Sequence, residues 1–186
     1  NQTANDNVAI GYRTLVANTT GTRNVGVGNS ALDANTTASY NTAVGTYALT
    51  ASNADNNTAI GYYALAADTT GSNNTAIGYD ALGDNTEGGH NVAFGRSALS
   101  KNIDADRNVA VGNYSLELNT AGNDNVALGY NALENNTTAD YNVAVGNAAL
   151  QNNSTGANNT AVGYKALNVN TTGSTNTAVG GYAMED

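Results

Sequence analysis

A five-residue phrase, Asn-(Thr/Val)-Ala-(Val/Ile)-Gly, recurs along this chain with few substitutions and at nearly constant spacing. It occurs eleven times in 186 residues, and nine of the ten intervals are 17 residues long. Internal repetition of this kind decides the fold before any local propensity does, because each repeat must pack on its neighbours. We therefore predict a single repeat domain spanning residues 1–186. The copies begin at Asn7, Asn24, Asn41, Asn57, Asn74, Asn91, Asn108, Asn125, Asn142, Asn159 and Asn176, and the interval from Asn41 to Asn57 is the one of 16 residues.

The charged residues divide the repeat into an inner and an outer set. Counting the phrase's Asn as repeat position 1, position 5 is always Gly, position 8 is nearly always Ala, and position 9 is Leu in ten copies. None of the 15 acidic or six basic residues occupies positions 1 to 5, 8 or 9. We predict that these positions form the interior or the contacts between coils, and that the others form the surface.

The period favours an all-β, parallel β-solenoid (β-roll). Seventeen residues are fewer than the 20–29 of repeats that combine a strand with a helix. Positions 2 to 5 alternate in size, as a strand does, and positions 7 to 9 are predicted to form a second short strand. Positions 12 to 15, typically Asn-Thr-Thr-Gly, are predicted to be a turn. A helical turn over positions 6 to 12 is the alternative, since Ala and Leu favour helices. Eleven coils would stack into a rod roughly 50 Å long.

The size alternation predicts which strand residues face inward. In the copy beginning at Asn57, we expect Thr58 and Ile60 to face the core with Leu65 filling it, and the small Ala59 and Gly61 to face outward. An uncharged, small outer face is expected to pack against another subunit, because a thin core needs support from oligomerisation. The residues predicted for this subunit contact are Ala59, Gly61, Ala76, Gly78, Ala110 and Gly112.

The Asn and Gly of the phrase each need a physical reason. Asn at position 1 is a poor strand residue, so we predict an eleven-rung ladder in which side-chain amides hydrogen-bond along the stack. The unvarying Gly at position 5 indicates a special backbone conformation or the close approach of another chain.

The phrases Asn7–Gly11 and Asn108–Gly112 resemble the Ser-Val-Ala-Ile-Gly phrase of trimeric autotransporter adhesin heads. The longer clause from Asn159 to Gly173 is similar to arrays in trimeric phage tail fibres and bacterial surface fibres. The resemblance covers the whole chain, although the adhesin-head repeat is usually shorter than 17 residues. It implies a left-handed β-roll assembled as a homotrimer, placed outside the cell on a cell or virion surface. We expect no anchor, coiled-coil stalk or chaperone domain among these repeats.

Composition disfavours several functional classes. The net charge of −9 argues against nucleic acid as a partner, and no apolar run is long enough for membrane insertion as a helix. His90 is the only histidine, at a variable surface position, and Gly26-Val27-Gly28 is a repeat copy rather than a phosphate loop. We expect no enzymatic activity, cofactor or metal. The alternative of a calcium site in the turns lacks the pattern of calcium-binding β-rolls; its ligands would be Asp84, Asp104, Asp106 and Asp124.

Tyrosine is the residue type in this sequence that could indicate a binding partner. Nine of the eleven tyrosines lie at positions 6 or 7, which predicts an interrupted aromatic stripe along the rod. It could stack on sugars, or it could pack against the neighbouring coil or subunit with its hydroxyls in water. The candidate surface-binding residues are Tyr12, Tyr62, Tyr79, Tyr130 and Tyr164.

The function predicted from these features is that of a structural and adhesive fibre segment, a rigid trimeric shaft or head. The chain begins at position 12 and ends at position 11, so we expect an excerpt of a longer array, or head-to-tail stacking into filaments. The alternative is a binding module for a surface glycan, a host-cell receptor or ice. Ice binding is disfavoured because the Thr of position 2 is expected to face inward and the pair at positions 13 and 14 is sequential.

Overall fold

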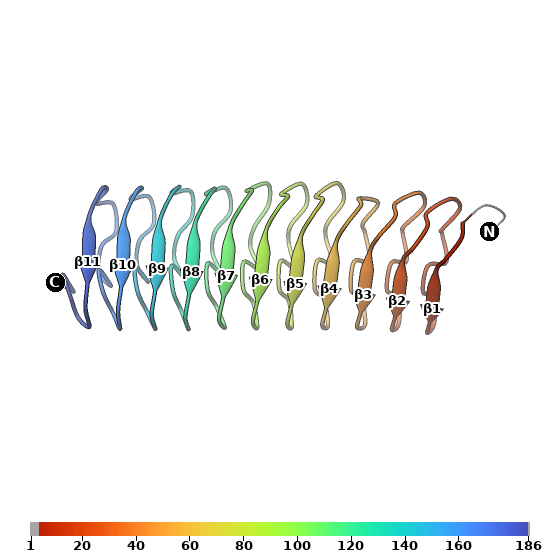
Figure 1. The fold of residues 1–186 in the computed structure, drawn as a ribbon, viewed down its shortest axis with the longest axis horizontal. Helices are drawn as coiled ribbons and strands as arrows, with labels where there is room; N and C mark the ends of the chain where they lie inside the picture. Colours follow the sequence, from red (N-terminus) through yellow and green to blue (C-terminus); the bar gives the residue numbers. More distant parts are fainter. Residues whose placement is uncertain (1–3, 186) are drawn as a thin grey trace.

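The computed structural model describes residues 4–185, which form an elongated stack of coils that runs from one end of the rod to the other (Figure 1). Each coil contributes one strand, and the eleven strands form a single parallel sheet in sequence order. The fold is thus the predicted all-β parallel solenoid. The strands are β1 Val8–Ile10, β2 Val25–Val27, β3 Thr42–Val44, β4 Thr58–Ile60, β5 Thr75–Ile77, β6 Val92–Phe94, β7 Val109–Val111, β8 Val126–Leu128, β9 Val143–Val145, β10 Thr160–Val162 and β11 Thr177–Val179.

The strand register keeps equivalent residues above one another throughout the sheet. Ala93 pairs with Ala110, for example, and the flanking residues of β6 and β7 pair in the same way. The 16-residue interval does not disturb this register, because Thr42 still pairs with Thr58. The missing residue is therefore absorbed outside the strand, in the turns that follow Leu49.

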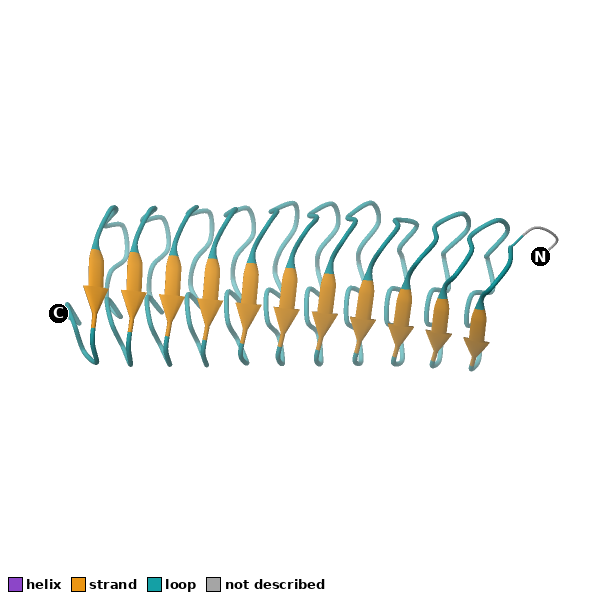
Figure 2. Cartoon of the chain, viewed as in Figure 1, coloured by secondary structure: helices purple, strands orange, loops and turns teal. Residues whose placement is uncertain are grey.

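Each coil has one three-residue strand, and turns and bends make up the rest of it (Figure 2). The second strand predicted at positions 7 to 9 is wrong, and the helical alternative is also wrong for the described residues. The reason lies in the backbone, because positions 7 and 9 take positive φ. Ser97 and Leu99, for example, both have φ 53°, which is outside the β region. Stacking nevertheless continues through the turns, since Leu99 N donates to Ser115 O at 3.0 Å.

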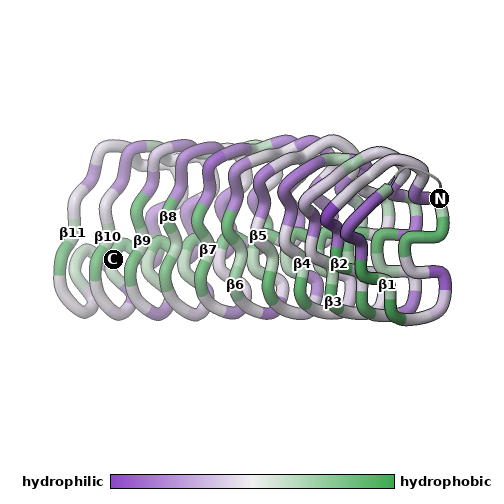
Figure 3. Tube along the Cα trace, turned by 45° about the vertical axis from the view of Figure 1, so that its right-hand side comes forward, coloured by the Kyte–Doolittle hydropathy of each residue, from purple (hydrophilic) through white to green (hydrophobic). Residues whose placement is uncertain are grey.

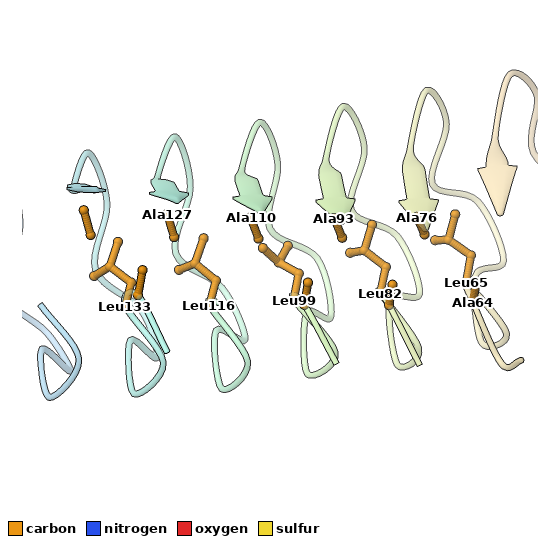
Figure 4. Close-up of a cluster of buried hydrophobic side chains, with 14 of the residues drawn as sticks. Ala64, Leu65, Ala76, Leu82, Ala93, Leu99, Ala110, Leu116, Ala127 and Leu133 are labelled. Atoms are coloured by element: carbon orange, nitrogen blue, oxygen red, sulfur yellow. The ribbon is translucent and has the colours of Figure 1, made fainter. Parts of the chain in front are cut away.

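The interior is built from alanine and leucine, which reverses the predicted orientation of the strand. Ala59, Ala76 and Ala110 are fully buried within the single chain, as are the Leu side chains of position 9 such as Leu65. Figure 4 shows these Leu and Ala side chains meeting inside successive coils. The narrow coil explains the reversal: with Leu filling it from one side, only a methyl group fits on the facing strand.

The larger strand residues at positions 2 and 4 therefore face outward, and we call this surface the branched face. Ile60 is 39% exposed and Phe94 is 53% exposed, whereas Ala between such residues is buried. Thr58 also lies on this outer side, contrary to prediction. Hydrophilic segments gather along the upper edge of the rod, which is one of the two edges at which the chain turns (Figure 3).

The glycine of position 5 is required by the stacking of coils within one chain. Gly95 has φ 145°, and a Cβ built on it would lie 2.5 Å from the carbonyl oxygen of Gly112. Gly61 and Gly78 are related in the same way. The special backbone predicted for this position is confirmed, but the close neighbour is the next coil rather than another subunit.

Candidate functional surfaces and buried ladders

The asparagines of position 1 form a buried ladder, with a different bonding pattern from the one predicted. The Asn91 side-chain Oδ1 accepts from the backbone N–H of Asn108 at 2.9 Å, and its Nδ2 donates to the carbonyl of Ala105 at 2.8 Å. The first bond joins neighbouring coils and the second closes the coil itself. Bonds between side-chain amides are the exception here, as between Asn125 Nδ2 and Asn108 Oδ1 at 3.2 Å. This ladder therefore satisfies buried backbone groups, which are costly to leave unpaired.

A second ladder occupies position 12, where the sequence predicts only the start of a turn. Here amides do bond directly along the stack: Asn102 Nδ2 donates to Asn85 Oδ1 at 2.7 Å, and Asn136 Nδ2 donates to Asn119 Oδ1 at 2.8 Å. The recurrence of Asn at this position is the signal in the sequence that could reveal it. The asparagines of this ladder in the described chain are Asn18, Asn35, Asn85, Asn102, Asn119, Asn136, Asn153 and Asn170.

The second ladder is interrupted where the short repeat lies. Ser52 and Asp68 replace Asn in two successive coils, and both are fully buried. Asp68 accepts from Ser52 Oγ at 2.8 Å, from Asn85 Nδ2 at 3.0 Å and from Gly71 N at 3.1 Å. Burial raises the pKa of the Asp68 carboxyl to about 6, against the lowering effect of these hydrogen bonds. One coil before the interruption, Asn35 Oδ1 is buried and has no hydrogen-bond partner among the described residues.

Tyrosines of positions 6 and 7 form a continuous line of half-buried and exposed rings over six coils, which we call the tyrosine row. Tyr62 and Tyr79 stack with ring centroids 5.5 Å apart, and Tyr114 meets Tyr130 edge-to-face at 5.9 Å. The Arg96 guanidinium joins these groups, lying 5.7 Å from the Tyr79 centroid and 5.5 Å from that of Tyr114. The members of the row are Tyr47, Tyr62, Tyr63, Tyr79, Arg96, Tyr114 and Tyr130.

Two of the predicted surface tyrosines lie outside this row. Tyr164 forms a separate pair with Tyr182, with centroids 5.1 Å apart and Lys165 beside both rings. Tyr12 is 72% exposed, and no ring contact joins it to another tyrosine among the described residues. The stripe is therefore interrupted, as predicted, and its longest part runs from Tyr47 to Tyr130.

The aspartates considered for calcium do not converge on one point. Asp84 binds Lys101 at 2.8 Å, while Asp106 and Asp124 both pair with Arg107. Across residues 4–185, no group of three or more His, Cys, Asp or Glu side chains gathers as a metal site would require. His90, which has φ 60°, is exposed as predicted.

A shallow depression of about 330 Å³ lies at the short repeat, beside the turn of positions 12 to 15. Here Asn53 stands in place of the usual Thr pair, and Asn53 Oδ1 accepts from the backbone N–H groups of Thr36 and Thr37, each at 3.0 Å. The lining is made of small and mainly polar side chains, so the depression offers little apolar surface to a ligand. It consists of Thr37, Ala38, Asn53, Ala54, Asp55, Thr70 and Ser72.

The subunit contact predicted on the small face needs correction. Ala59, Ala76 and Ala110 cannot touch another subunit, because their side chains are enclosed by their own chain. Gly61, Gly78 and Gly112 face the backbone of the following coil. The uncharged surface that remains accessible is the branched face.

Comparisons of the chain with protein-family models, curated proteins and solved structures find no match. Among residues 4–185 there is also no helix with the length and apolar character needed to span a membrane.

Proposed function

We propose that the chain is a structural and adhesive segment of an extracellular fibre, in which copies of the chain pack side by side as a homotrimer. The observation that carries the proposal is the branched face. It follows all eleven strands, bears no charged residue, and exposes aliphatic side chains such as Ile60, Val111 and Val162. Contiguous exposed apolar surface of this kind marks contacts with a partner.

The partner is a copy of the same chain because the branched face repeats with the coil. Two such faces present matching rows of side chains at the same spacing, so contacts formed at one coil recur at each of the remaining coils. A homotrimer follows from the resemblance to trimeric adhesin heads and fibres. The function is mechanical: continuous hydrogen bonds along the backbone and the two Asn ladders stiffen the rod, which spaces or displays a binding surface away from a cell or virion.

The test is the molar mass of the purified chain in solution, measured by light scattering after size exclusion. We expect three times the 18.8 kDa chain mass. Val111→Lys should reduce the mass to that of one chain while the circular dichroism spectrum is retained, since Val111 is 37% exposed in the lone chain. Thr138→Lys, at an exposed residue in the turn of positions 12 to 15, should leave the mass unchanged. A wild-type mass of one chain would refute the proposal.

Ice binding is a second candidate for the same face, favoured by the outward orientation of position 2. Thr42, Thr58 and Thr75 pair in register on three successive strands, giving a regular hydroxyl line on the side opposite to the one expected from the sequence. Thermal hysteresis of the purified chain tests it. Activity in a monomeric chain that is lost in Thr58→Lys would support ice binding, and absence of hysteresis would discard it.

A further inference from the structure

The tyrosine row lies outside the packed interior, and three of its members, Tyr47, Tyr63 and Tyr114, occupy a position whose backbone does not favour tyrosine. Tyr63 and Tyr114 have φ near 60°, a region where bulky residues are uncommon and Asn or Asp are better tolerated. Other coils place Asp80 and Asn131 at the same position. The rings also stay accessible: Tyr62 is 45% and Tyr63 40% exposed. Neither backbone preference nor burial explains why tyrosines gather there.

The rings are arranged so that some of their faces stay accessible. In an edge-to-face pair, only one ring loses a face to its neighbour, and the other contributes its edge. Tyr47 meets Tyr62 at 79° between ring planes, and Tyr114 meets Tyr130 at 89°. Tyr130 is 49% exposed. The row therefore offers aromatic surface in a line one or two side chains wide, parallel to the rod.

Hydrogen-bonding groups alternate with these rings. Asp80 follows Tyr79 and Asn113 precedes Tyr114 in the sequence, so these coils each supply one ring and one polar side chain. A linear ligand that fits such a line has apolar ring faces and polar edges repeated along its length. A polysaccharide chain has this character, because pyranose rings present C–H faces and hydroxyl edges.

The charges beside the row select among polysaccharides. Arg96 is the one cation in the row. Beside it, the carboxylates of Asp80, Glu117 and Glu134 outnumber the one further cation, Lys101, which is itself paired with Asp84 at 2.8 Å. The chain as a whole has a net charge of −9. An anionic polymer would be repelled by this field, whereas a neutral one would not.

We propose that the tyrosine row binds a neutral polysaccharide along the rod axis, with the exposed parts of Tyr62, Tyr79 and Tyr130 in contact with sugar rings. The site lies within one chain and uses no residue of the branched face. It is therefore independent of the trimer, and the two proposals can fail separately.

Affinity electrophoresis tests the site with named polymers: hydroxyethyl cellulose, xyloglucan, galactomannan and dextran as neutral probes, and alginate and heparin as anionic ones. We expect at least one neutral polymer to retard the chain and neither anionic polymer to do so. The double variant Tyr62→Ala with Tyr79→Ala should weaken that binding at least tenfold. Tyr141→Ala, an exposed tyrosine outside the row, should bind as the wild type does.

Loss of binding must be distinguished from loss of the fold, so the rings are also replaced conservatively. Tyr62→Phe with Tyr79→Phe keeps the aromatic faces and should retain most of the retardation. Thermal unfolding of each variant is measured alongside. The proposal is overturned if no neutral polymer retards the wild type, if Tyr141→Ala loses as much affinity as the double alanine variant, or if heparin binds as well as the neutral polymers.

Discussion

Ser52 Oγ donates a hydrogen bond to Asp68 Oδ2 at 2.8 Å, against the direction of the other rungs of its ladder. Elsewhere each Asn donates to the preceding coil, as Asn102 does to Asn85. An ionised Asp68 has no proton to give, so Ser52 must donate to it. Asn35 Oδ1, one coil earlier, is left buried without a partner in the described part of the chain. The replacement of Asn by Ser52 and Asp68 in two successive coils thus changes the bonding of three.

The first prediction concerns Asp68→Asn and pH. The folded-state pKa of Asp68 is raised from 3.8 to about 6, so the folded chain favours the protonated acid. Its contribution to stability is present below pH 3.8 and is lost as the pH rises through about 6. Asp68→Asn should therefore stabilise the chain at pH 8 by about 3 kcal/mol more than at pH 3.5. The amide that this substitution introduces can also donate to Ser52, which frees the serine proton for another acceptor.

Urea unfolding at several pH values measures this difference. Asp104→Asn, at an exposed position, is the matched control and should follow the pH profile of the wild type. Parallel profiles for the wild type and Asp68→Asn would contradict the assigned role of burial.

The second prediction tests the orientation of the strand with two adjacent residues. Ala110 is fully buried against Leu side chains, so Ala110→Leu should overpack the coil and lower the free energy of unfolding by about 1–3 kcal/mol. Val111→Leu, one residue later and facing outward, should change it by less than about 0.5 kcal/mol. Denaturant titration of both variants under conditions that keep the chain monomeric makes the comparison. Equal effects would mean that the strand does not have a single buried side.

The third prediction concerns the first Asn ladder. Asn108→Ala removes the acceptor of the Asn125 backbone N–H and the donor to Gly122 O, both buried. Leaving such groups unpaired should cost about 1–3 kcal/mol per group. Asn147→Ala, at an exposed position, removes an amide of the same kind from the surface and should be nearly neutral. Thermal melting of the two variants distinguishes a buried rung from simple loss of an asparagine.

The repeat period predicts the solenoid and the Asn ladder of position 1, because those features depend only on which residues recur. The inner and outer faces are harder to predict. A strand with Val or Ile at two positions and Ala between them satisfies alternation in either orientation. The buried side of the strand is set by Leu at position 9, which fills the coil from the opposite wall. The direction of this Leu depends on a positive φ at non-glycine residues such as Leu99, and nothing in the local sequence indicates that conformation. The ring contacts of the tyrosine row depend on the same turns, so the sequence alone does not reveal them.

The last prediction is that Gly95→Ala, which adds only one methyl group, lowers the stability of the chain strongly. Alanine at φ 145° is strained, and its Cβ would lie 2.6 Å from the carbonyl carbon of Gly112 as well as close to the oxygen. Relief requires two coils to separate, which breaks the hydrogen bond from Gly112 N to Phe94 O at 2.8 Å. We expect a loss of at least about 2 kcal/mol. Gly181→Ala, where a Cβ meets its nearest atom at 4.0 Å, should be tolerated. Similar melting temperatures for the two variants would show that adjacent coils can yield at the glycine row, and the rod would then be more compliant than its continuous ladders imply.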